Sequence, residues 1–271
     1  MTRFLKTVIT ITLSIAGIMF AIIPESCFKD YALISFKTES TTVMFNRVIC
    51  CIGVFIVVSI ICGLHLKFRR KITIKGRNYC IEVQYGDLFK QKKCKRVIDF
   101  DECFTNSVGA TPSEINADSI CGQYLKANPI DNIHTLIDAS GLRPSEKKSA
   151  FQAKECYPSG SILPKGDDLL MAFAKLDPDG LGRMTRDEYI DSLSLLWKEI
   201  DKFYGQKDVC IPVIGSGVTR IDDATLSQQE LLDIVIASYR LSSKKIKIPN
   251  KLRIICKRRD DFSLNKVGES F

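Results

Sequence analysis

Two long apolar stretches dominate the hydrophobic pattern at the start of the chain. Residues 7–23 and 48–66 contain no charged side chain. A helix of about 20 apolar residues crosses a hydrocarbon core about 30 Å thick, whereas a helix on the surface of a soluble domain shows a polar face about every 3.6 residues. The pattern therefore predicts two transmembrane helices, joined as a hairpin that occupies residues 1–71.

A secretory signal peptide is the alternative for the first stretch, because Arg3 and Lys6 precede it. The apolar run is longer than the core of a usual signal peptide, and no Ala-x-Ala-like cleavage site precedes Cys27. Both observations favour a true membrane span.

The charges that flank the two stretches predict their orientation. Residues 24–47, between the stretches, carry three basic and three acidic side chains. Excess positive charge marks the cytoplasmic side of a span. Both chain termini are therefore predicted to be cytoplasmic, with a short loop outside. The segments before the first stretch and directly after the second contain no acid and these basic residues: Arg3, Lys6, Lys67, Arg69, Arg70 and Lys71.

Residues 72–271 show shorter apolar runs that alternate with helix-like segments. Strands are predicted at residues 72–74, 79–85, 96–100, 161–163, 169–176, 209–214 and 252–256. Helices are predicted at residues 119–127, 132–139, 185–204 and 226–241. Alternating strands and helices predict an α/β domain whose sheet is covered on both faces, and ligands of such sheets bind at the carboxyl ends of the strands.

Individual residues mark the ends and faces of the predicted helices. Asp118 is a candidate N-cap for the first helix, and Gly141 is expected to close the second. The helix at 185–204 shows one apolar stripe, which we expect to pack on the sheet. The stripe contains Ile190, Leu193, Trp197, Ile200 and Tyr204.

A glycine loop, Gly215-Ser216-Gly217, follows the apolar strand predicted at 209–214. Glycines allow the backbone to approach a phosphate, and main-chain N–H groups beside a helix start favour an anion. A tight strand-to-helix turn without a ligand is the alternative interpretation. The segment that begins near Leu226 would supply the helix start.

Residues 177–188 resemble the loop of an EF-hand. Asp177, Asp179 and Glu188 occupy its acidic positions, and Gly182 its glycine position. Leu181 stands where a further oxygen ligand is needed, and there is no second hand. Thr185 and Glu188 also form a Thr-x-x-Glu capping box, which explains the pattern without calcium. No metal site is therefore predicted.

Charge and cysteine usage limit the functional classes. The chain carries a net charge of +8, but residues 1–71 contain nine basic and three acidic residues, which leaves only +2 for the rest. A nucleic-acid-binding domain would carry the positive charge itself, so this function is not expected. Eleven cysteines without a Cys-x-x-Cys pair, and only two histidines, favour a reducing compartment and argue against zinc.

Three segments in order resemble a macro domain, a fold that binds ADP-ribose. Gly86-Asp87-Leu88 resembles the Gly-Asp-Ile segment whose aspartate accepts from the adenine amino group. Residues 157–166 are similar to the glycine-containing stretch before a central strand. Residues 211–218 resemble the Pro-x-Ile-Gly-x-Gly diphosphate loop. The resemblance implies a macro-domain-like mixed sheet flanked by helices, over roughly residues 72–260.

The hairpin together with this divergent macro domain resembles the ThsA effectors of type II Thoeris anti-phage systems. The resemblance implies a non-catalytic sensor in the cell inner membrane. Its ligand would be an ADP-ribose derivative, of the histidine-conjugated type, made by a TIR-domain partner. Binding would drive a homo-oligomer to disrupt the lipid bilayer and cause abortive infection. The implied ligand-binding residues are Asp87, Leu88, Asn106, Ser107, Gly215, Ser216, Gly217, Val218, Thr219 and Arg220.

The sequence departs from macro domains that hydrolyse ADP-ribose linkages. Their Asn-Ala-Ala-Asn segment is replaced here by Asp99-Phe100-Asp101-Glu102. The loss of the asparagines favours a binder, although any of the three acids can act as a general base. A membrane-tethered ADP-ribosyl hydrolase is therefore the alternative function, and a calcium-regulated or structural membrane adaptor is a third.

Overall fold

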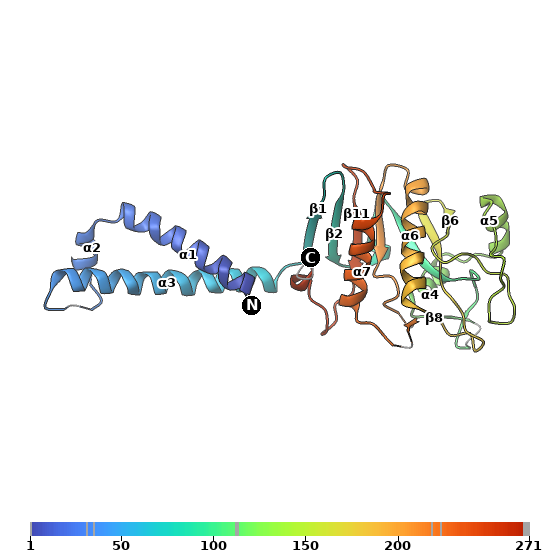
Figure 1. Cartoon of the computed structure of the whole chain (residues 1–271), viewed down its shortest axis with the longest axis horizontal. Helices are drawn as coiled ribbons and strands as arrows, with labels where there is room; N and C mark the ends of the chain where they lie inside the picture. Colours follow the sequence, from blue (N-terminus) through green and yellow to red (C-terminus); the bar gives the residue numbers. More distant parts are fainter. Residues whose placement is uncertain are drawn as a thin grey trace. The chain divides into compact units, whose positions relative to one another are not determined.

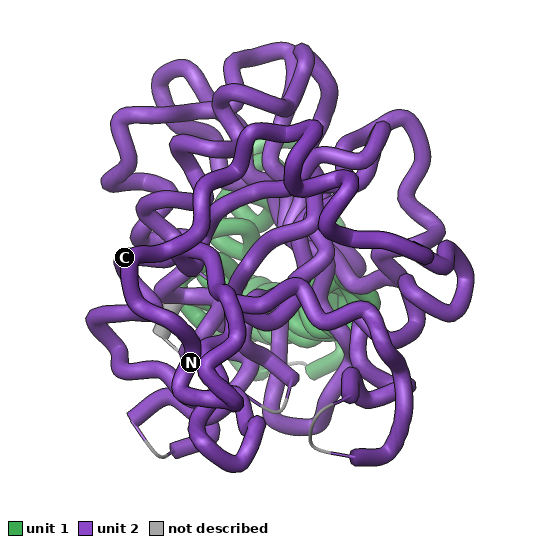
Figure 2. The backbone as a smooth tube through the Cα atoms, turned by 90° about the vertical axis from the view of Figure 1, so that its right-hand side faces the viewer, with its two compact units in different colours: residues 1–69 green, residues 70–271 purple. Residues whose placement is uncertain are grey.

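The computed structural model describes residues 2–30, 32–34, 36–111, 114–217, 219–222 and 224–267. The chain separates into two compact units, Met1–Arg69 and Arg70–Phe271, which Figure 2 distinguishes by colour. The first unit is helical and contains both apolar stretches. The second unit contains the sheet.

Three helices form the first unit: α1 Thr2–Ile22, α2 Glu25–Asp30 and α3 Glu39–Lys67. Helix α3 begins at Glu39, well before the apolar stretch that starts at Val48, so Arg47 lies inside a helix and not in a loop. Two of the described helices are long and apolar enough to cross a membrane, over Phe4–Ile22 and Glu39–Lys67.

Polar side chains of α3 hold the connection that precedes it. The side-chain oxygen of Asn46 accepts hydrogen bonds from Leu33 N (2.8 Å) and Ile34 N (3.3 Å), and its amide donates to Ile34 O (2.8 Å). Thr42 Oγ1 accepts from Phe36 N at 2.8 Å. These bonds satisfy main-chain groups outside the helices, which explains why Asn46 and Thr42 are buried on an apolar helix.

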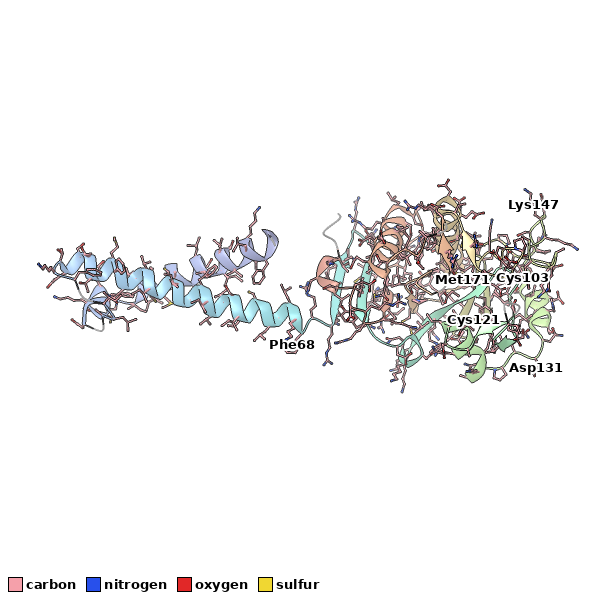
Figure 3. The ribbon with its side chains drawn as sticks, turned by 90° about the horizontal axis from the view of Figure 1, so that it is seen from below. Phe68, Cys103, Cys121, Asp131, Lys147 and Met171 are labelled. Atoms are coloured by element: carbon pink, nitrogen blue, oxygen red, sulfur yellow. The ribbon has the colours of Figure 1, made fainter. Side chains whose placement is uncertain are left out.

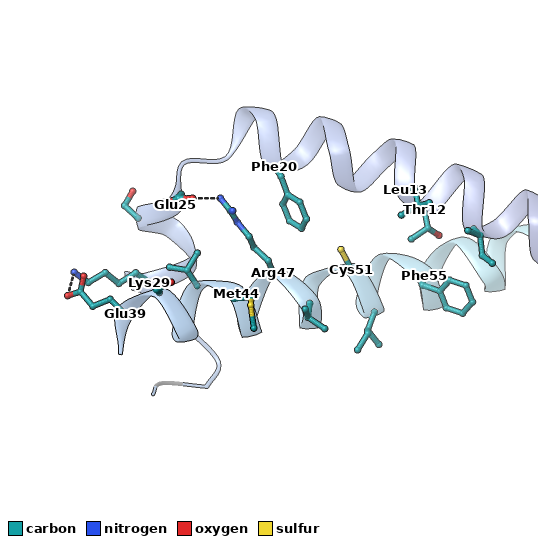
Figure 4. A pocket seen from close by; sticks show the side chains of 16 residues that line it. Thr12, Leu13, Phe20, Glu25, Lys29, Glu39, Met44, Arg47, Cys51 and Phe55 are labelled. Carbon is teal, nitrogen blue, oxygen red and sulfur yellow. Dashed lines mark ion pairs between the residues drawn. The ribbon is translucent and has the colours of Figure 1, made fainter. Parts of the chain in front are cut away.

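Arg47 lies between α1, α2 and α3 (Figure 4). Its guanidinium pairs with Glu25 at 3.0 Å and lies over the rings of Phe20 and Phe28, at 5.5 and 5.4 Å from their centroids. Arg47, Glu25 and Phe20 are among the residues that line a groove of about 850 Å³ between α1 and α3. The ion pair and the ring contacts offset the cost of placing a cation next to apolar helices.

The second unit is built on a seven-stranded mixed sheet of order β1-β2-β11-β9-β3-β7-β6. Its five central strands run parallel, and the edge strands β1 and β6 pair antiparallel with β2 and β7. The mixed α/β architecture predicted from the sequence is confirmed. The strands are β1 Lys71–Lys75, β2 Cys80–Tyr85, β3 Cys94–Asp101, β6 Ile162–Lys165, β7 Asp168–Ala174, β9 Asp208–Pro212 and β11 Leu252–Cys256.

Helices cover both faces of this sheet. Helices α6 Arg186–Phe203 and α7 Gln228–Leu241 lie beside each other on one face (Figure 1). Helices α4 Ile120–Ala127 and α5 Ile133–Ser140 pack on the other. Alternate residues of β3 enter the two cores: Val97 joins the α6 and α7 side, and Ile98 joins the α4 and α5 side. Side-chain alternation along a strand produces this division.

The helix ends show which local predictions hold. Thr185 and Glu188 form the expected capping box of α6, and Gly141 closes α5 in the left-handed region with φ +67°. The N-cap of α4 is Ser119 and not Asp118, because Ser119 Oγ accepts from Gly122 N at 2.9 Å. The stripe of α6 is wrong at Ile190, which is 46% exposed, since the buried face runs through its neighbour Tyr189.

Short elements between the main ones were not predicted. Two ribbons of two residues per strand join β4 Val108–Gly109 to β5 Ile115–Asn116, and β8 Arg183–Met184 to β10 Arg220–Ile221. Two 3₁₀ turns occupy Leu88–Lys90 and Leu264–Lys266. The strand that was expected to reach residue 214 ends at Pro212, and the one expected to reach residue 176 ends at Ala174.

Candidate ligand-binding site

The sheet has a switch point between its neighbouring strands β3 and β9. Their pairing ends at Arg96 and Cys210, although β3 continues beside β7 to Asp101 and β9 continues beside β11 to Pro212. The chain leaves β3 toward β6 and β7, and leaves β9 toward β11. Ligands of open α/β sheets bind where neighbouring connections diverge in this way. We call the carboxyl ends of β2, β11, β9 and β3 the switch-point site.

The glycine loop follows β9 at this site. Gly215 has φ +81°, and a Cβ there would stand 3.4 Å from the ring of Tyr189. The Tyr189 hydroxyl donates to Ile214 O at 2.8 Å, and Ser216 N donates to Val213 O at 3.1 Å. The left-handed backbone at Gly215 favours glycine, and the buried Tyr189 stabilises the turn through its ring contact and its hydrogen bond.

The remainder of the predicted diphosphate loop is more open. A Cβ on Gly217 would meet nothing within 4 Å, and Arg220 is exposed. Arg220 N donates to Gly182 O at 3.0 Å, and Thr219 lies beside Gly182. The loop thus joins the β8–β10 ribbon before it reaches α7. Val218 lies outside the described residues.

The helix expected near Leu226 is α7, which begins at Gln228 with Ser227 as its N-cap, and its first turn is closed by its own capping box. Glu230 N donates to Ser227 Oγ at 3.3 Å, and the Glu230 carboxylate accepts from Ser227 N at 2.8 Å. The capping box uses two N–H groups at this helix start, those of Ser227 and Glu230, and a role of the helix start in an anion site stays a prediction.

Asp87 begins the 3₁₀ turn that follows β2. Its Oδ1 accepts from Phe89 N at 2.9 Å, and its Oδ2 lies 4.0 Å from the Lys90 amine. Leu88 is buried, so it supports the turn. Gly86 N donates to Cys256 O at 3.2 Å, which ties this loop to the end of β11. The Asp87 carboxylate remains about half exposed and can accept a donor from a ligand.

A basic run that sequence reasoning missed follows β11: Lys257-Arg258-Arg259. Arg259 Nη2 donates to Ser216 O in the glycine loop at 3.0 Å, and Arg258 lies 5.1 Å from the ring centroid of Tyr85, at the end of β2. Because β11 lies between β2 and β9, the run connects the two predicted loops. The sequence shows this run as three consecutive basic residues directly after the strand predicted at 252–256.

A cavity of about 330 Å³ accompanies this basic run. Arg70, Tyr85, Gly86, Cys256 and Arg258 line it. Two arginines and main-chain groups at the carboxyl ends of parallel strands suit an anionic ligand.

Asn106 and Ser107 have main-chain partners of their own. The Asn106 amide donates to Ile130 O at 2.8 Å, and Ser107 O accepts from Ile115 N at 2.8 Å. These contacts tie both residues to the α4–α5 connection and to the β4–β5 ribbon. Their place in a distal pocket stays a prediction.

Two of the three acids near the end of β3, Asp101 and Glu102, accept hydrogen bonds from main-chain N–H groups. Asp101 Oδ1 accepts from Cys103 N (2.8 Å) and Thr105 N (3.1 Å). Burial raises the pKa of Asp101, and the bonds from Thr105 and Cys103 oppose this shift. Glu102 accepts from Ser149 Oγ and from Leu176 N at 3.1 Å. Both acids are therefore used to fix loops.

Asp99 differs from its two neighbours. Its Oδ1 is buried and has no hydrogen-bond partner among the described residues. Burial raises the pKa of Asp99 to about 6, and the residue's own backbone N–H and, less strongly, the Lys257 charge oppose this shift. It is the one acid of the three with an oxygen left over for chemistry or binding, within the part of the chain that the structure describes.

The EF-hand-like segment is explained by local contacts. Asp177 Oδ1 accepts from Asp179 N (3.0 Å) and Leu181 N (2.9 Å), and its Oδ2 pairs with Arg183 at 2.8 Å. Glu188 pairs with Lys175 at 2.7 Å and accepts from Thr185 N at 2.8 Å. The acids that would bind calcium thus form a turn and a helix cap that support the β8–β10 ribbon.

Comparison with known proteins identifies the family. Residues 81–257 match the family model described as Thoeris protein ThsA, macro domain. The chain is also 29% identical over 223 residues to the Thoeris protein ThsA of Bacillus amyloliquefaciens (strain Y2), covering 79% of this chain and 74% of that protein.

Solved structures with a similar arrangement include the Oceanobacillus iheyensis macrodomain. A point mutant of it is 11% identical with a TM-score of 0.46, and the match covers 70% of this chain and 91% of that one. The same macrodomain with ADP is 11% identical with a TM-score of 0.41, over 70% and 89% of the two chains. The family match covers more than half of the chain and the Thoeris relative spans most of it, so this chain belongs to the ThsA family of Thoeris proteins and carries that family's macro domain.

Proposed function

We propose that the chain is a membrane-anchored sensor that binds an ADP-ribose derivative at the switch-point site. As a ThsA-family protein with a macro domain it fits anti-phage defence. The observation that carries the ligand proposal is the bond from Arg259 to Ser216 O, which brings a guanidinium to the glycine loop. Charge-assisted bonds from arginine and main-chain N–H groups are the usual partners of a diphosphate.

In this proposal each part of the site binds one part of the ligand. The diphosphate would lie on the Gly215–Thr219 backbone and the basic run, and the adenine amino group would donate to Asp87. Arg220 would lie near the phosphates or the distal ribose. Because β11 separates the two loops by one strand, an elongated nucleotide would cross the end of β11, along the 330 Å³ cavity.

The hairpin would convert binding into an effect on the membrane. In the proposal, a TIR-domain partner supplies the signal, both termini stay in the cytoplasm, and several copies assemble in the inner membrane to disrupt the bilayer. A ligand shifts such an assembly only if it binds one state more tightly than the other. Release of a dye from liposomes that contain the full-length protein, on addition of the ligand, tests this step.

Calorimetry of the full-length protein in nanodiscs with ADP-ribose tests the ligand site. Gly217→Glu places a carboxylate in open space beside the proposed diphosphate, so we expect it to fold and to weaken binding at least tenfold, while Gly217→Ala stays near wild type. Gly215 is unsuitable for this test, because its φ of +81° strains any side chain. Equal affinities of the Glu and Ala variants would overturn the placement of the diphosphate.

Hydrolysis of an ADP-ribose linkage is a second candidate, favoured by one observation. Asp99 has a buried oxygen without a hydrogen-bond partner in the described part of the chain and a pKa of about 6, which suits a general base. Chromatography of an ADP-ribosylated substrate would detect turnover. Turnover that is lost in Asp99→Asn would establish hydrolase activity. A wild-type protein that binds ADP-ribose without turnover would exclude the hydrolase and support the sensor.

A further inference from the structure

The groove of about 850 Å³ between α1 and α3 has a charged end and an apolar end. Its charged side chains gather toward α2 (Figure 4): Glu25, Lys29, Glu39 and Arg47. Beyond Arg47, the residues of α3 that line the groove are apolar as far as Phe55. We call this the α1–α3 groove. Its division suits an amphipathic ligand, because polar and apolar parts of a ligand need different surroundings.

The four charges of the α1–α3 groove form two ion pairs and sum to zero. Arg47 lies 3.0 Å from Glu25, and Lys29 lies 2.7 Å from Glu39. All four side chains remain accessible, from 30% for Arg47 to 75% for Glu39. A zwitterion matches this end of the groove, since its phosphate can accept from the bases and its ammonium can donate to the acids. A purely anionic head group would instead face two carboxylates of its own sign.

The length of the α1–α3 groove matches one leaflet of a bilayer. From Glu39 to Phe55 it follows roughly 24 Å of α3, at about 1.5 Å per residue. One leaflet with its head groups is about 20–22 Å thick. Arg47 directly precedes the apolar stretch that starts at Val48, so its charge lies at the level where a lipid phosphate meets the acyl chains.

The predicted topology assigns the α1–α3 groove to one leaflet. Its charged end lies at the start of α3, and Phe68 follows the other end of this helix (Figure 3). The basic flank after α3 predicts a cytoplasmic side there and an outside location for residues 24–47. In that orientation the groove opens into the outer leaflet of the membrane.

The α1–α3 groove is too narrow to seat a helix of a second copy. Its volume over this length gives a cross-section of roughly 35 Å², whereas a helix with its side chains is about 10–12 Å across. An extended acyl chain is much thinner. A second groove of about 730 Å³, lined by other residues of α1 and α3 such as Val57, has no charged side chain in its described lining. The second groove therefore lacks a place for a head group.

We propose that the α1–α3 groove binds one phospholipid with a primary-amine head group, of the phosphatidylethanolamine type, from the outer leaflet. The phosphate lies against the two bases, with Arg47 nearest the acyl chains, and the ammonium lies against the two acids. One acyl chain follows α3 toward Phe55. The inference rests on the proposed function, because it requires the hairpin to lie in a bilayer.

Native mass spectrometry of the full-length protein tests the inference. The protein is released from nanodiscs that contain equal parts of phosphatidylethanolamine, phosphatidylcholine and phosphatidylglycerol. We expect one retained lipid per chain, with phosphatidylethanolamine preferred by about twofold to fivefold, the factor for one exposed ion pair. The choline head group has no N–H to donate, and phosphatidylglycerol has no cation for the acids.

Glu39→Gln tests the charged end of the groove. It removes one acceptor for the ammonium and leaves Lys29 without its partner carboxylate, so the preference should move from phosphatidylethanolamine to phosphatidylglycerol. Asp30→Asn is the matched control, because it removes the same charge from the same segment outside the described lining of the groove. It should keep the wild-type preference.

Val48→Trp tests the apolar end. Val48 lines the α1–α3 groove and is 50% exposed, so the indole would occupy the space of the acyl chain. Retention of every lipid should fall by at least about fivefold, as overpacking of a filled site predicts. Val57→Trp is the matched control, since Val57 is 55% exposed on the same helix and lines the second groove. It should retain lipid as the wild type does.

The outcomes separate the inference from the function on which it rests. A wild-type protein that does not stay with membranes overturns the proposed function and the inference with it. A membrane-bound protein that retains no lipid, retains the three lipids equally, or keeps its preference in Glu39→Gln overturns the inference alone. Loss of lipid in Val57→Trp but not in Val48→Trp overturns it by placing the lipid in the second groove. A dimer that only Val48→Trp abolishes overturns it by assigning the α1–α3 groove to a second copy.

Discussion

The hairpin and the macro domain contain the same types of apolar residue, but the hairpin exposes them and the macro domain buries them. Leu13 of α1 is 66% exposed, whereas Leu193 of α6 is 0% exposed. In the macro domain, apolar side chains recur on one face of each helix and meet the sheet. In the hairpin, most of the large apolar side chains of α1 and α3 are exposed, which is the pattern of a helix that can cross a membrane.

The comparison shows that hydrophobicity alone does not decide burial within the chain. What differs is the spacing of polar residues, which is periodic in α6 and absent across the apolar part of α3. A periodic helix gains its stability by leaving water for a protein core, and an all-apolar helix does so by leaving water for a bilayer. The same substitution should therefore have different effects in the two units.

Truncation of a leucine gives the largest expected contrast. Leu193→Ala leaves a cavity between α6 and the sheet, and we expect it to lower the free energy of unfolding of the macro domain by about 2–5 kcal/mol. Leu13→Ala removes the same atoms from an exposed position and should leave that free energy unchanged. Urea denaturation followed by Trp197 fluorescence measures both. Similar losses in the two variants would contradict the contrast.

The periodic pattern predicted most of the fold but not the exact face of α6. Three- and four-residue steps from Leu193 lead correctly to Trp197 and Ile200, and wrongly to Ile190. Tyr189, next to it, is buried instead because its hydroxyl reaches Ile214 O below the glycine loop. A three-residue step back from Leu193 leads to Ile190 and a four-residue step leads to Tyr189, so the apolar spacing alone does not choose between these two neighbours.

A charge within the apolar surface gives the next largest effect. Val57 lies near the middle of the apolar part of α3 and is exposed. Val57→Arg should make insertion less favourable by about 2.5–3.5 kcal/mol, the cost of an arginine at the centre of a span. The measured quantity is the fraction of protein that stays with membranes after carbonate extraction. ADP-ribose binding by the detergent-solubilised variant should be unchanged.

Val57→Leu is the matched control for this substitution. It keeps the position apolar and should leave the membrane fraction at the wild-type level. A Val57→Arg protein that remains fully membrane-bound would show that α3 does not present this side chain to lipid, and would remove the basis for treating exposure in the hairpin as lipid contact.

The binding site was less predictable than the fold. The sequence indicated the two loops at Asp87 and Gly215, because glycines and a strand end leave a local pattern. It did not indicate the bond from Arg259 to Ser216, since that contact depends on the strand order that brings β11 beside β9. It also indicated a helix start after the glycine loop, near Leu226, and α7 begins two residues later with a capping box of Ser227 and Glu230. Contacts between distant segments are the part that local patterns omit.

Helix caps give the smallest expected contrast between the two units. Thr185 caps α6 through a complete capping box, whereas Thr38, at the same position of α3, makes no side-chain cap bond. Thr185→Ala should lower the free energy of unfolding of the macro domain by about 1 kcal/mol, and Thr38→Ala should change the stability of neither unit. Thermal denaturation of both variants, with and without Ca²⁺, measures the difference. The loss of stability in Thr185→Ala should be the same in both conditions, because the Glu188 carboxylate bonds Thr185 N and pairs with Lys175. A loss seen only with Ca²⁺ would instead assign residues 177–188 to a calcium site.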